Sequence, residues 1–168
     1  MLISKKMIAA INTQIGNEFG ASLQYVAIAA YFGSESLPEL CRHFNQQALE
    51  ERDHAMKFVN YIVDAGGRVE IPAVASPKSK FASAEEAVKL SLDWEITVTK
   101  QINGLIDLAA KENDHTTHSF LQWFVNEQLE EVSSMDTLLR IIRRAGANLL
   151  FVEDYLARKG SRPAAPAV

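Results

Sequence analysis

Four stretches of the sequence place apolar residues at alternating steps of three and four, which is the spacing of a helix that buries one face. The positions are Ile8, Ile11, Ile15, Glu18, Ser22, Tyr25, Ala29 and Phe32 in the first; Leu40, Phe44, Gln47, Glu51, His54, Phe58, Tyr61 and Ala65 in the second; Val88, Ser91, Glu95, Val98, Ile102, Leu105 and Ala109 in the third; and Thr117, Leu121, Phe124, Gln128, Glu131, Met135, Leu138 and Ile142 in the fourth. We call these four stripes the seams. Four long helices that each bury one face predict an all-α four-helix bundle.

Each seam contains one glutamate: Glu18, Glu51, Glu95 and Glu131. No seam position is Lys or Arg, so His54 is the one possible cationic partner within the seams. Burying this much unpaired negative charge would cost many kcal/mol, on the order of several per ion. Bound metal cations would remove that cost. The sequence therefore predicts a metal site inside the bundle, and a purely structural bundle does not explain these residues.

Residues that favour helix ends divide the chain into four long helices and a short fifth one. We expect the first helix to begin at Ser4 and end near Phe32-Gly33, and the second to begin at Ser36, with Pro38 just inside, and end at Gly66-Gly67. The third should begin at Ser83, in a capping box with Glu86, and end at Asn113, and the fourth should run from Asp114 to Gly146. The short fifth helix should run from Asn148 to about Lys159. We expect one domain over residues 1–160 and a disordered tail over residues 161–168.

The connection from Gly66 to Ala82 is much longer than the other two between long helices. In extended form it would reach about 55 Å, which is enough to travel back along a whole helix of this length. We therefore expect the second and third helices to run parallel, joined by one long crossover. Short turns at the other two connections make each flanking pair antiparallel.

Charge and composition exclude several classes of protein. The chain of 168 residues has a net charge of −4, which argues against nucleic acid as a partner. No apolar run approaches the roughly 20 residues that span a bilayer, and the N-terminus does not resemble a signal peptide. The single cysteine, Cys41, is consistent with a reducing compartment, so we expect a cytoplasmic protein with no membrane partner.

The four glutamates are expected at one height in the bundle. Glu18 and Glu51 lie almost equally far from the first turn, within about 2 Å along the axis. Glu95 and Glu131 are likewise equidistant from the turn near Asn113. Both pairs therefore fall near the middle of the bundle.

Glu51 and His54 share one face of their helix at spacing i, i+3. Di-iron carboxylate bundles take one Glu from each of two helices and a Glu-x-x-His pair from each of the other two. Here the fourth helix offers Gln128 and Glu131 instead of a second pair. We expect one metal at Glu18, Glu51 and His54, and a more weakly held one at Glu51, Glu95 and Glu131. Oxygen ligands with one imidazole favour iron or manganese over zinc or copper.

These residues, in this order, resemble the non-haem bacterial ferritins over nearly the whole chain. The similarity is greatest in Asn17-Glu18-Phe19, Glu50-Glu51-Arg52-Asp53-His54-Ala55 and Trp123-Phe124-Val125-Asn126-Glu127-Gln128-Leu129-Glu130-Glu131. The resemblance implies a ferritin-like bundle, a ferroxidase centre that oxidises Fe(II) with dioxygen or hydrogen peroxide, and iron storage in a shell of 24 identical subunits.

The resemblance also implies roles for individual residues. It maps a first iron site to Glu18, Glu51 and His54, and a second to Glu51, Glu95 and Glu131 with Gln128 alongside. An accessory site maps to Glu50, Glu127 and Glu130, with Glu131 as a further candidate, so that roughly two to three iron ions bind per chain. Without the resemblance, Glu50, Glu127 and Glu130 would be interpreted as a solvated face. Tyr25 matches a tyrosine beside the centre, although an aromatic core position is the alternative.

Three related classes are alternatives. Haem-containing bacterioferritins carry a methionine where this chain has Arg52, and a second Glu-x-x-His where it has Gln128 and Glu131, so we expect no haem. A non-storing di-iron oxidase or peroxidase would lack a shell and often has a second redox domain. A DNA-protecting miniferritin places its metal between subunits.

Two further features have open interpretations. Asp114, His115 and His118 would either line a channel for iron or form a solvated helix start. The apolar residues of the fifth helix, among them Leu150 and Tyr155, predict that it packs at a symmetry axis of the shell.

Overall fold

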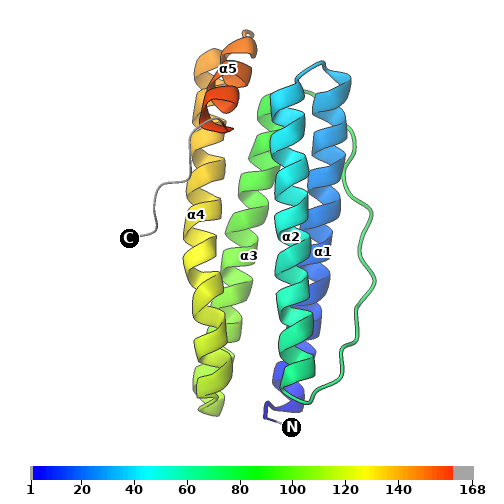
Figure 1. Cartoon of the computed structure of the whole chain (residues 1–168), viewed down its shortest axis with the longest axis vertical. Coiled ribbons are helices and arrows are strands. Elements are labelled where there is room, and N and C mark those ends of the chain that lie inside the picture. The colour runs from blue at the N-terminus through cyan, green and yellow to red at the C-terminus, as the bar shows by residue number, and fades with distance from the viewer. Residues whose placement is uncertain (1, 161–168) are drawn as a thin grey trace.

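The computed structural model describes residues 2–160, which form a bundle of four long helices with a short helix at one end (Figure 1). The helices are α1 (Lys5–Ser34), α2 (Pro38–Asp64), α3 (Ala84–Glu112), α4 (His115–Ala145) and α5 (Leu150–Gly160). The pairs α1–α2 and α3–α4 are antiparallel, while α2 and α3 run in the same direction. The predicted all-α fold, the long crossover and the short fifth helix are thus confirmed. The expected tail, residues 161–168, lies outside the described residues.

Local hydrogen bonds fix most of the helix ends as the sequence predicts. The Ser4 and Asp114 side chains accept hydrogen bonds from the backbone N–H groups of Met7 and Thr117. Ser83 Oγ accepts from Glu86 N at 3.1 Å, while the Glu86 carboxylate accepts from Ala82 N, so the capping box closes one residue earlier than expected. Asn113 ends α3 in the left-handed conformation, and Gly146 ends α4.

The predicted cap of α2 is wrong. Leu37, not Ser36, is the N-cap residue, and it makes no side-chain hydrogen bond to the helix. Ser36 instead adopts a positive φ of 59° in the turn. The Glu153 carboxylate of α5 accepts hydrogen bonds from the backbone N–H groups of Glu39 and Leu40, at 2.7 and 2.9 Å. Glu153, which is distant in sequence, thus caps the start of α2 in place of a neighbouring residue. The same hydrogen bonds connect α5 to α2.

The crossover between α2 and α3 lies along α1 (Figure 1). Two buried amides of α1 hold it there. Asn12 donates to Arg68 O at 3.3 Å and accepts from Glu70 N at 3.0 Å. Gln24 donates to the Lys78 carbonyl at 2.8 Å and accepts from its N–H at 2.9 Å. Each side chain thus pairs with crossover backbone as a neighbouring strand would, which satisfies backbone groups that have no partner of their own.

The apolar core forms two clusters, one on each side of the level at which the seam glutamates lie. One includes Tyr25, Phe32 and Phe44, and the other includes Ile15, Phe58 and Phe124. Every predicted seam position is buried except Ile8, Ser22 and Tyr61, which are half-buried. Within residues 2–160, none of the helices has the length and apolarity to span a bilayer. The two clusters leave a polar layer between them at mid-bundle.

Candidate metal centre

The polar layer receives side chains from all four long helices. Glu18 comes from α1, Glu51 and His54 from α2, Glu95 from α3 and Glu131 from α4. Their exposed fractions are 1%, 1%, 3%, 0% and 5%, so all five are shielded from solvent. The burial follows from the seam pattern, because each residue occupies a position that the helix turns toward the bundle axis.

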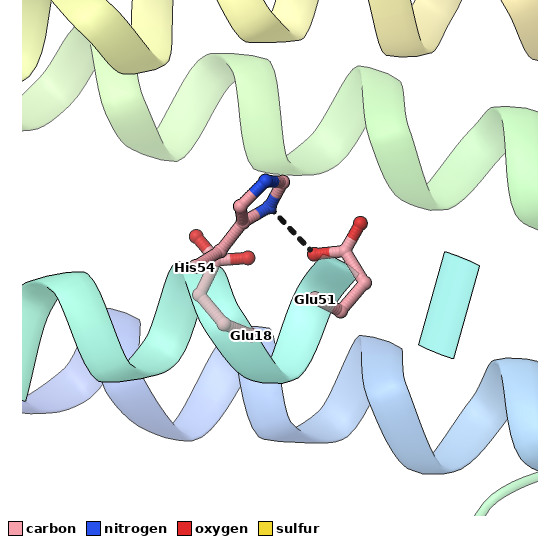
Figure 2. Close-up of side chains that lie close together, drawn as sticks. All are labelled: Glu18, Glu51 and His54. Atoms are coloured by element: carbon pink, nitrogen blue, oxygen red, sulfur yellow. Dashed lines mark hydrogen bonds and ion pairs between the residues drawn. The ribbon is translucent and has the colours of Figure 1, made fainter. Parts of the chain in front are cut away.

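Glu18, Glu51 and His54 form a compact group in the site (Figure 2). One potential ligand atom from each of the three lies within 4.8 Å of the others. His54 Nδ1 is 3.3 Å from Glu51 Oε2, a contact that the i, i+3 spacing on α2 produces. The structure therefore brings together the three residues predicted for the first metal.

Two carboxylate oxygens in this group have no hydrogen-bond partner among residues 2–160: Oε2 of Glu18 and Oε1 of Glu51. Both atoms are fully buried, so water does not solvate them either. A buried charge without a partner is costly, and native proteins rarely keep one. Carboxylate oxygens with one imidazole suit a divalent iron or manganese ion. The donors present thus fit a bound metal, which would satisfy both atoms.

Glu95 lies in a different environment, with both oxygens engaged. The Tyr25 hydroxyl donates to Oε1, and Gln128 Nε2 donates to Oε2 at 3.4 Å. Thr99 Oγ1 donates to Gln128 Oε1 at 2.9 Å and also lies 2.8 Å from the backbone carbonyl of Glu95. Tyr25 is completely buried. It therefore contacts the site directly and is not only an aromatic core residue.

The predicted second set, Glu51, Glu95 and Glu131, does not form a group as compact as the first. Within the described chain, the other group of potential ligand atoms within 4.8 Å consists of His54, Glu127 and Glu131. Glu127 Oε1 lies 3.8 Å from His54 Nε2. His54 thus belongs to both groups and links Glu18 and Glu51 to the acidic residues of α4.

The expected accessory residues differ in their surroundings. Glu127 is half-buried and belongs to the group with His54 and Glu131. Glu50 is also half-buried, and it accepts hydrogen bonds from Gln46 at 3.0 Å and from Gln47. Glu130 is exposed and belongs to neither group of potential ligands.

Burial and mutual repulsion raise the pKa values of the glutamates. Desolvation is the main cause for Glu18 and Glu51, followed by the charge of Glu51 on Glu18 and by the charges of Glu95 and Glu131 on Glu51. Desolvation also raises the pKa of Glu95, and the hydrogen bonds from Tyr25 and Gln128 oppose that rise. Burial, with the charges of Glu95 and Glu50, raises the pKa of Glu131 to about 8. A bound cation would favour the ionised carboxylates and reverse these shifts.

Three polar residues of the site were not predicted: Gln14, Asn17 and Thr99. Gln14 Nε2 donates to Glu18 Oε1 at 2.8 Å, and Asn17 Nδ2 donates to Gln14 Oε1 at 3.1 Å. Gln14 precedes Glu18 by one helical turn and Thr99 follows Glu95 by one turn, so the i, i+4 spacing was the available signal.

The residues at the start of α4 favour the interpretation as a helix start. Both Asp114 oxygens accept hydrogen bonds from Thr117, one from its N–H at 2.9 Å and one from its hydroxyl. Asp114 therefore serves as the α4 cap. A channel lined with His115 and His118 stays a prediction.

Several known proteins to which this chain is similar belong to one family. The ferritin-like domain family matches residues 8–145. The chain is 47% identical to ferritin BfrB of Mycolicibacterium smegmatis, covering 98% of this chain and 93% of the relative. It is 40% identical to the bacterial non-heme ferritin of Staphylococcus aureus, covering 96% and 97%. An open pore ferritin from Archaeoglobus fulgidus superimposes with a TM-score of 0.91 at 36% identity, covering 96% and 99%. With its bundle topology, its buried carboxylates and these similarities along almost its entire length, the chain belongs to the ferritin family.

Proposed function

We propose that this protein stores iron and has ferroxidase activity: it oxidises Fe(II) with dioxygen or hydrogen peroxide within each subunit and keeps the Fe(III) as a mineral. The observation that carries the proposal is the pair of buried, unpartnered oxygens on Glu18 and Glu51, next to His54. The ferritin relatives support the iron-storage role. Roughly two to three iron ions would bind per chain, with no haem.

The side chains of the site have separate tasks in this reaction. Glu18, Glu51 and His54 bind the first Fe(II), and Glu51, Glu95 and Glu131 bind the second, with Gln128 alongside. Their negative charge compensates the higher charge of Fe(III), so the carboxylates favour the oxidised product. Each Fe(II) gives up one electron, and the oxidant accepts the electrons. The Tyr25 hydroxyl holds Glu95 while this happens.

A route out of the site is part of the proposal. Glu127 lies beside His54 and forms a group of potential ligands with His54 and Glu131 that does not include Glu18. Oxidised iron would pass from the buried residues to Glu127 and Glu50, which are half-buried, and then to Glu130, which is exposed. Increasing solvation lowers the affinity of carboxylates for the ion and allows it to leave.

Storage requires a closed shell, and we propose a homo-oligomer of 24 subunits in the cytoplasm. One observation that supports assembly is the apolar surface of α5. Leu150 is 72% exposed and Phe151 is 66% exposed, while Val152 and Leu156 on the other side of the helix are buried. Exposed side chains of this size, clustered on one helix, are typical of a surface that another subunit covers.

The proposal is tested by measuring Fe(II) oxidation and particle size on the same preparation. Glu51→Gln and His54→Ala should each slow the initial oxidation at least about tenfold, because ligands of the first metal are lost. Asp53→Asn is the matched control: this exposed residue lies between them on α2, and it should oxidise iron at the wild-type rate.

Gel filtration of the iron-loaded protein tests storage separately from oxidation. A shell-sized particle that co-elutes with on the order of hundreds of iron ions supports the proposal. That amount is more than the ligands of the subunits could bind as single ions, so it indicates a stored mineral. Rapid oxidation by a dimer-sized species that retains no mineral would mean a non-storing di-iron oxidase. Unchanged oxidation in Glu51→Gln and His54→Ala would overturn the assignment of the site.

A further inference from the structure

We infer that Gln14, oriented by Asn17, is a positioning residue that leaves Glu18 only one oxygen for the metal. The inference rests on the proposed function and adds a determinant outside the ligand set. Gln14 is 2% exposed and lies on α1 one turn before Glu18. It contacts the carboxylate, not the metal position, so its effect would act through Glu18.

The direction of the Gln14 amide follows from its two hydrogen bonds. Asn17 Nδ2 donates to Gln14 Oε1 at 3.1 Å, which occupies the acceptor end of that amide. The donor end, Nε2, then faces Glu18 and donates to Oε1 at 2.8 Å. An amide rotated by half a turn would put Oε1 against a carboxylate oxygen and Nε2 against a donor, and both contacts would repel. The Glu18 carboxylate thus requires the donor end of the Gln14 amide, and the hydrogen bond from Asn17 supports that direction.

The result is a carboxylate with one engaged and one free oxygen. Glu18 Oε1 is bonded to Gln14, and Oε2 is the buried atom without a partner. A metal bound by Glu18, Glu51 and His54 would thus meet one Glu18 oxygen, Oε2, that is already in position. Because the hydrogen bond holds the carboxylate rotamer, less side-chain freedom is lost when the metal binds.

Around Glu95, a second chain of two hydrogen bonds also ends on a carboxylate, but there no carboxylate oxygen is left free. We call each such chain of hydrogen bonds a relay. Thr99 donates to Gln128 Oε1, and Gln128 Nε2 donates to Glu95 Oε2 at 3.4 Å. Tyr25 engages the remaining oxygen of Glu95. When it binds metal, Glu95 therefore shares each oxygen with a hydrogen-bond donor, whereas Glu18 presents one oxygen that has no donor. The two relays predict unequal metal affinities for the two halves of the site.

The test uses Co(II), a divalent ion that oxygen does not oxidise under these conditions, and measures binding by calorimetry and visible absorption. Gln14→Leu, similar in volume but without the donor, should weaken the first Co(II) about ten- to a hundredfold and leave the second nearly unchanged. The infrared carboxylate bands that appear on Zn(II) binding should also change, because Glu18 is free to bind through both oxygens. Asn12→Leu is the control, since that buried amide on α1 bonds to the crossover backbone at Arg68 and Glu70 instead of to a glutamate of the site.

A second variant tests the relay without altering the buried amide. Asn17 is half-buried, so Asn17→Leu should fold, and it should weaken the first Co(II) in the same direction but less. In the Gln14→Leu background, Asn17→Leu should add no further loss, because Asn17 acts through Gln14. Thr99→Val should change the affinity for the second Co(II) and leave the affinity for the first unchanged. Its control is Thr97→Val, which removes a hydroxyl bonded only to its own helix, at Asp93 O.

The outcomes separate this inference from the proposed function. If the wild type binds two Co(II) ions and Gln14→Leu binds both with wild-type affinity and an unchanged infrared spectrum, the positioning role is wrong and the metal site stands. Additive losses in the double variant would overturn the relay through Asn17. If the wild type itself shows no saturable Co(II) binding, the proposed function fails first.

Discussion

The Tyr25 hydroxyl donates a hydrogen bond to Oε1 of Glu95, which lies 70 residues further along the chain on α3. Both side chains are completely buried. The contact joins two helices at the metal layer and opposes the rise in the pKa of Glu95 that burial causes. Tyr25 itself has a raised pKa, chiefly from burial and then from the charge of Glu95, so it remains a donor at neutral pH.

Tyr25→Phe should therefore weaken the second metal and spare the first. Without the hydroxyl, the pKa of Glu95 rises further, so a metal must displace a more tightly held proton. Near neutral pH we expect about a tenfold loss of affinity for the second Co(II), a magnitude usual for a hydrogen bond to a charged group. Calorimetry at several pH values checks this, since the second binding step should shift to higher pH. A loss confined to the first metal would contradict it.

The metal-free protein should lose stability as the pH rises. The folded-state pKa of Glu131 is about 8, against an ordinary value of 4.5, so the folded protein holds this proton more tightly than the unfolded chain. Its contribution to stability is complete below about pH 4.5 and is lost as the pH rises through about 8. Glu18, Glu51 and Glu95 shift in the same direction. Thermal unfolding from about pH 5 to pH 8.5 should show a falling Tm.

Glu131→Gln provides the matched variant for that measurement, because it keeps the shape and removes the titration. Its Tm should fall less steeply and should exceed the wild-type value near pH 8 by several degrees, since each pKa unit corresponds to about 1.4 kcal/mol. Adding Co(II) should reverse the wild-type trend, because metal binding competes with protons and grows stronger as the pH rises. Parallel curves for the metal-free wild type and the variant would show that Glu131 does not titrate in this range.

Removing the Glu153 carboxylate should loosen α5 without affecting iron binding. Glu153→Ala leaves the N–H groups of Glu39 and Leu40 without their acceptor, and a lost helix cap costs roughly 0.5–2 kcal/mol. Hydrogen exchange should accelerate in α5 and in the first turn of α2, while Co(II) affinity stays constant. Asp154→Ala is the control, because it removes an exposed ion pair with Arg158 on the same helix. Equal exchange in both variants would contradict the proposed tie between α5 and α2.

Two glycines of the bundle should respond oppositely to alanine. A Cβ at Gly16 would overlap the Pro72 ring of the crossover, with Cδ at 3.2 Å, so Gly16→Ala should destabilise the protein by about 1–3 kcal/mol. Gly104 lies within α3, and a Cβ there meets nothing within 4 Å, so Gly104→Ala should stabilise it by about 0.5–1 kcal/mol. Denaturant unfolding measures both. Neutral behaviour of Gly16→Ala would mean that the crossover does not pack closely on α1.

Most of the fold could be predicted because it depends on local spacing. The seams specify which face of each helix is buried, and helix lengths on either side of a tight turn place Glu18 beside Glu51. The cap of α2 could not be predicted in this way. A local rule selects Ser36, but the carboxylate that binds the helix start belongs to Glu153, and sequence spacing carries no information about a tertiary partner.

The candidate site was predictable in its charged residues and in Gln128, but not in the amides of α1. A glutamate in an apolar seam is conspicuous because its burial is costly, whereas Gln14 and Asn17 are uncharged and stand out less. The role of Gln14 becomes visible only when its two hydrogen bonds are known. The acidic residues of α4 show the same limit, since spacing alone does not distinguish half-buried Glu127 from exposed Glu130.

The most direct test of the central claim is an anaerobic calorimetric titration of Fe(II) into the metal-free protein, with Glu51→Gln alongside. The buried oxygens of Glu18 and Glu51 predict saturable binding of roughly two to three ions per chain in the wild type, and loss of the tightest site in the variant. Wild-type protein that takes up no Fe(II) saturably, or a variant that binds as the wild type does, would contradict the metal centre proposed for this bundle.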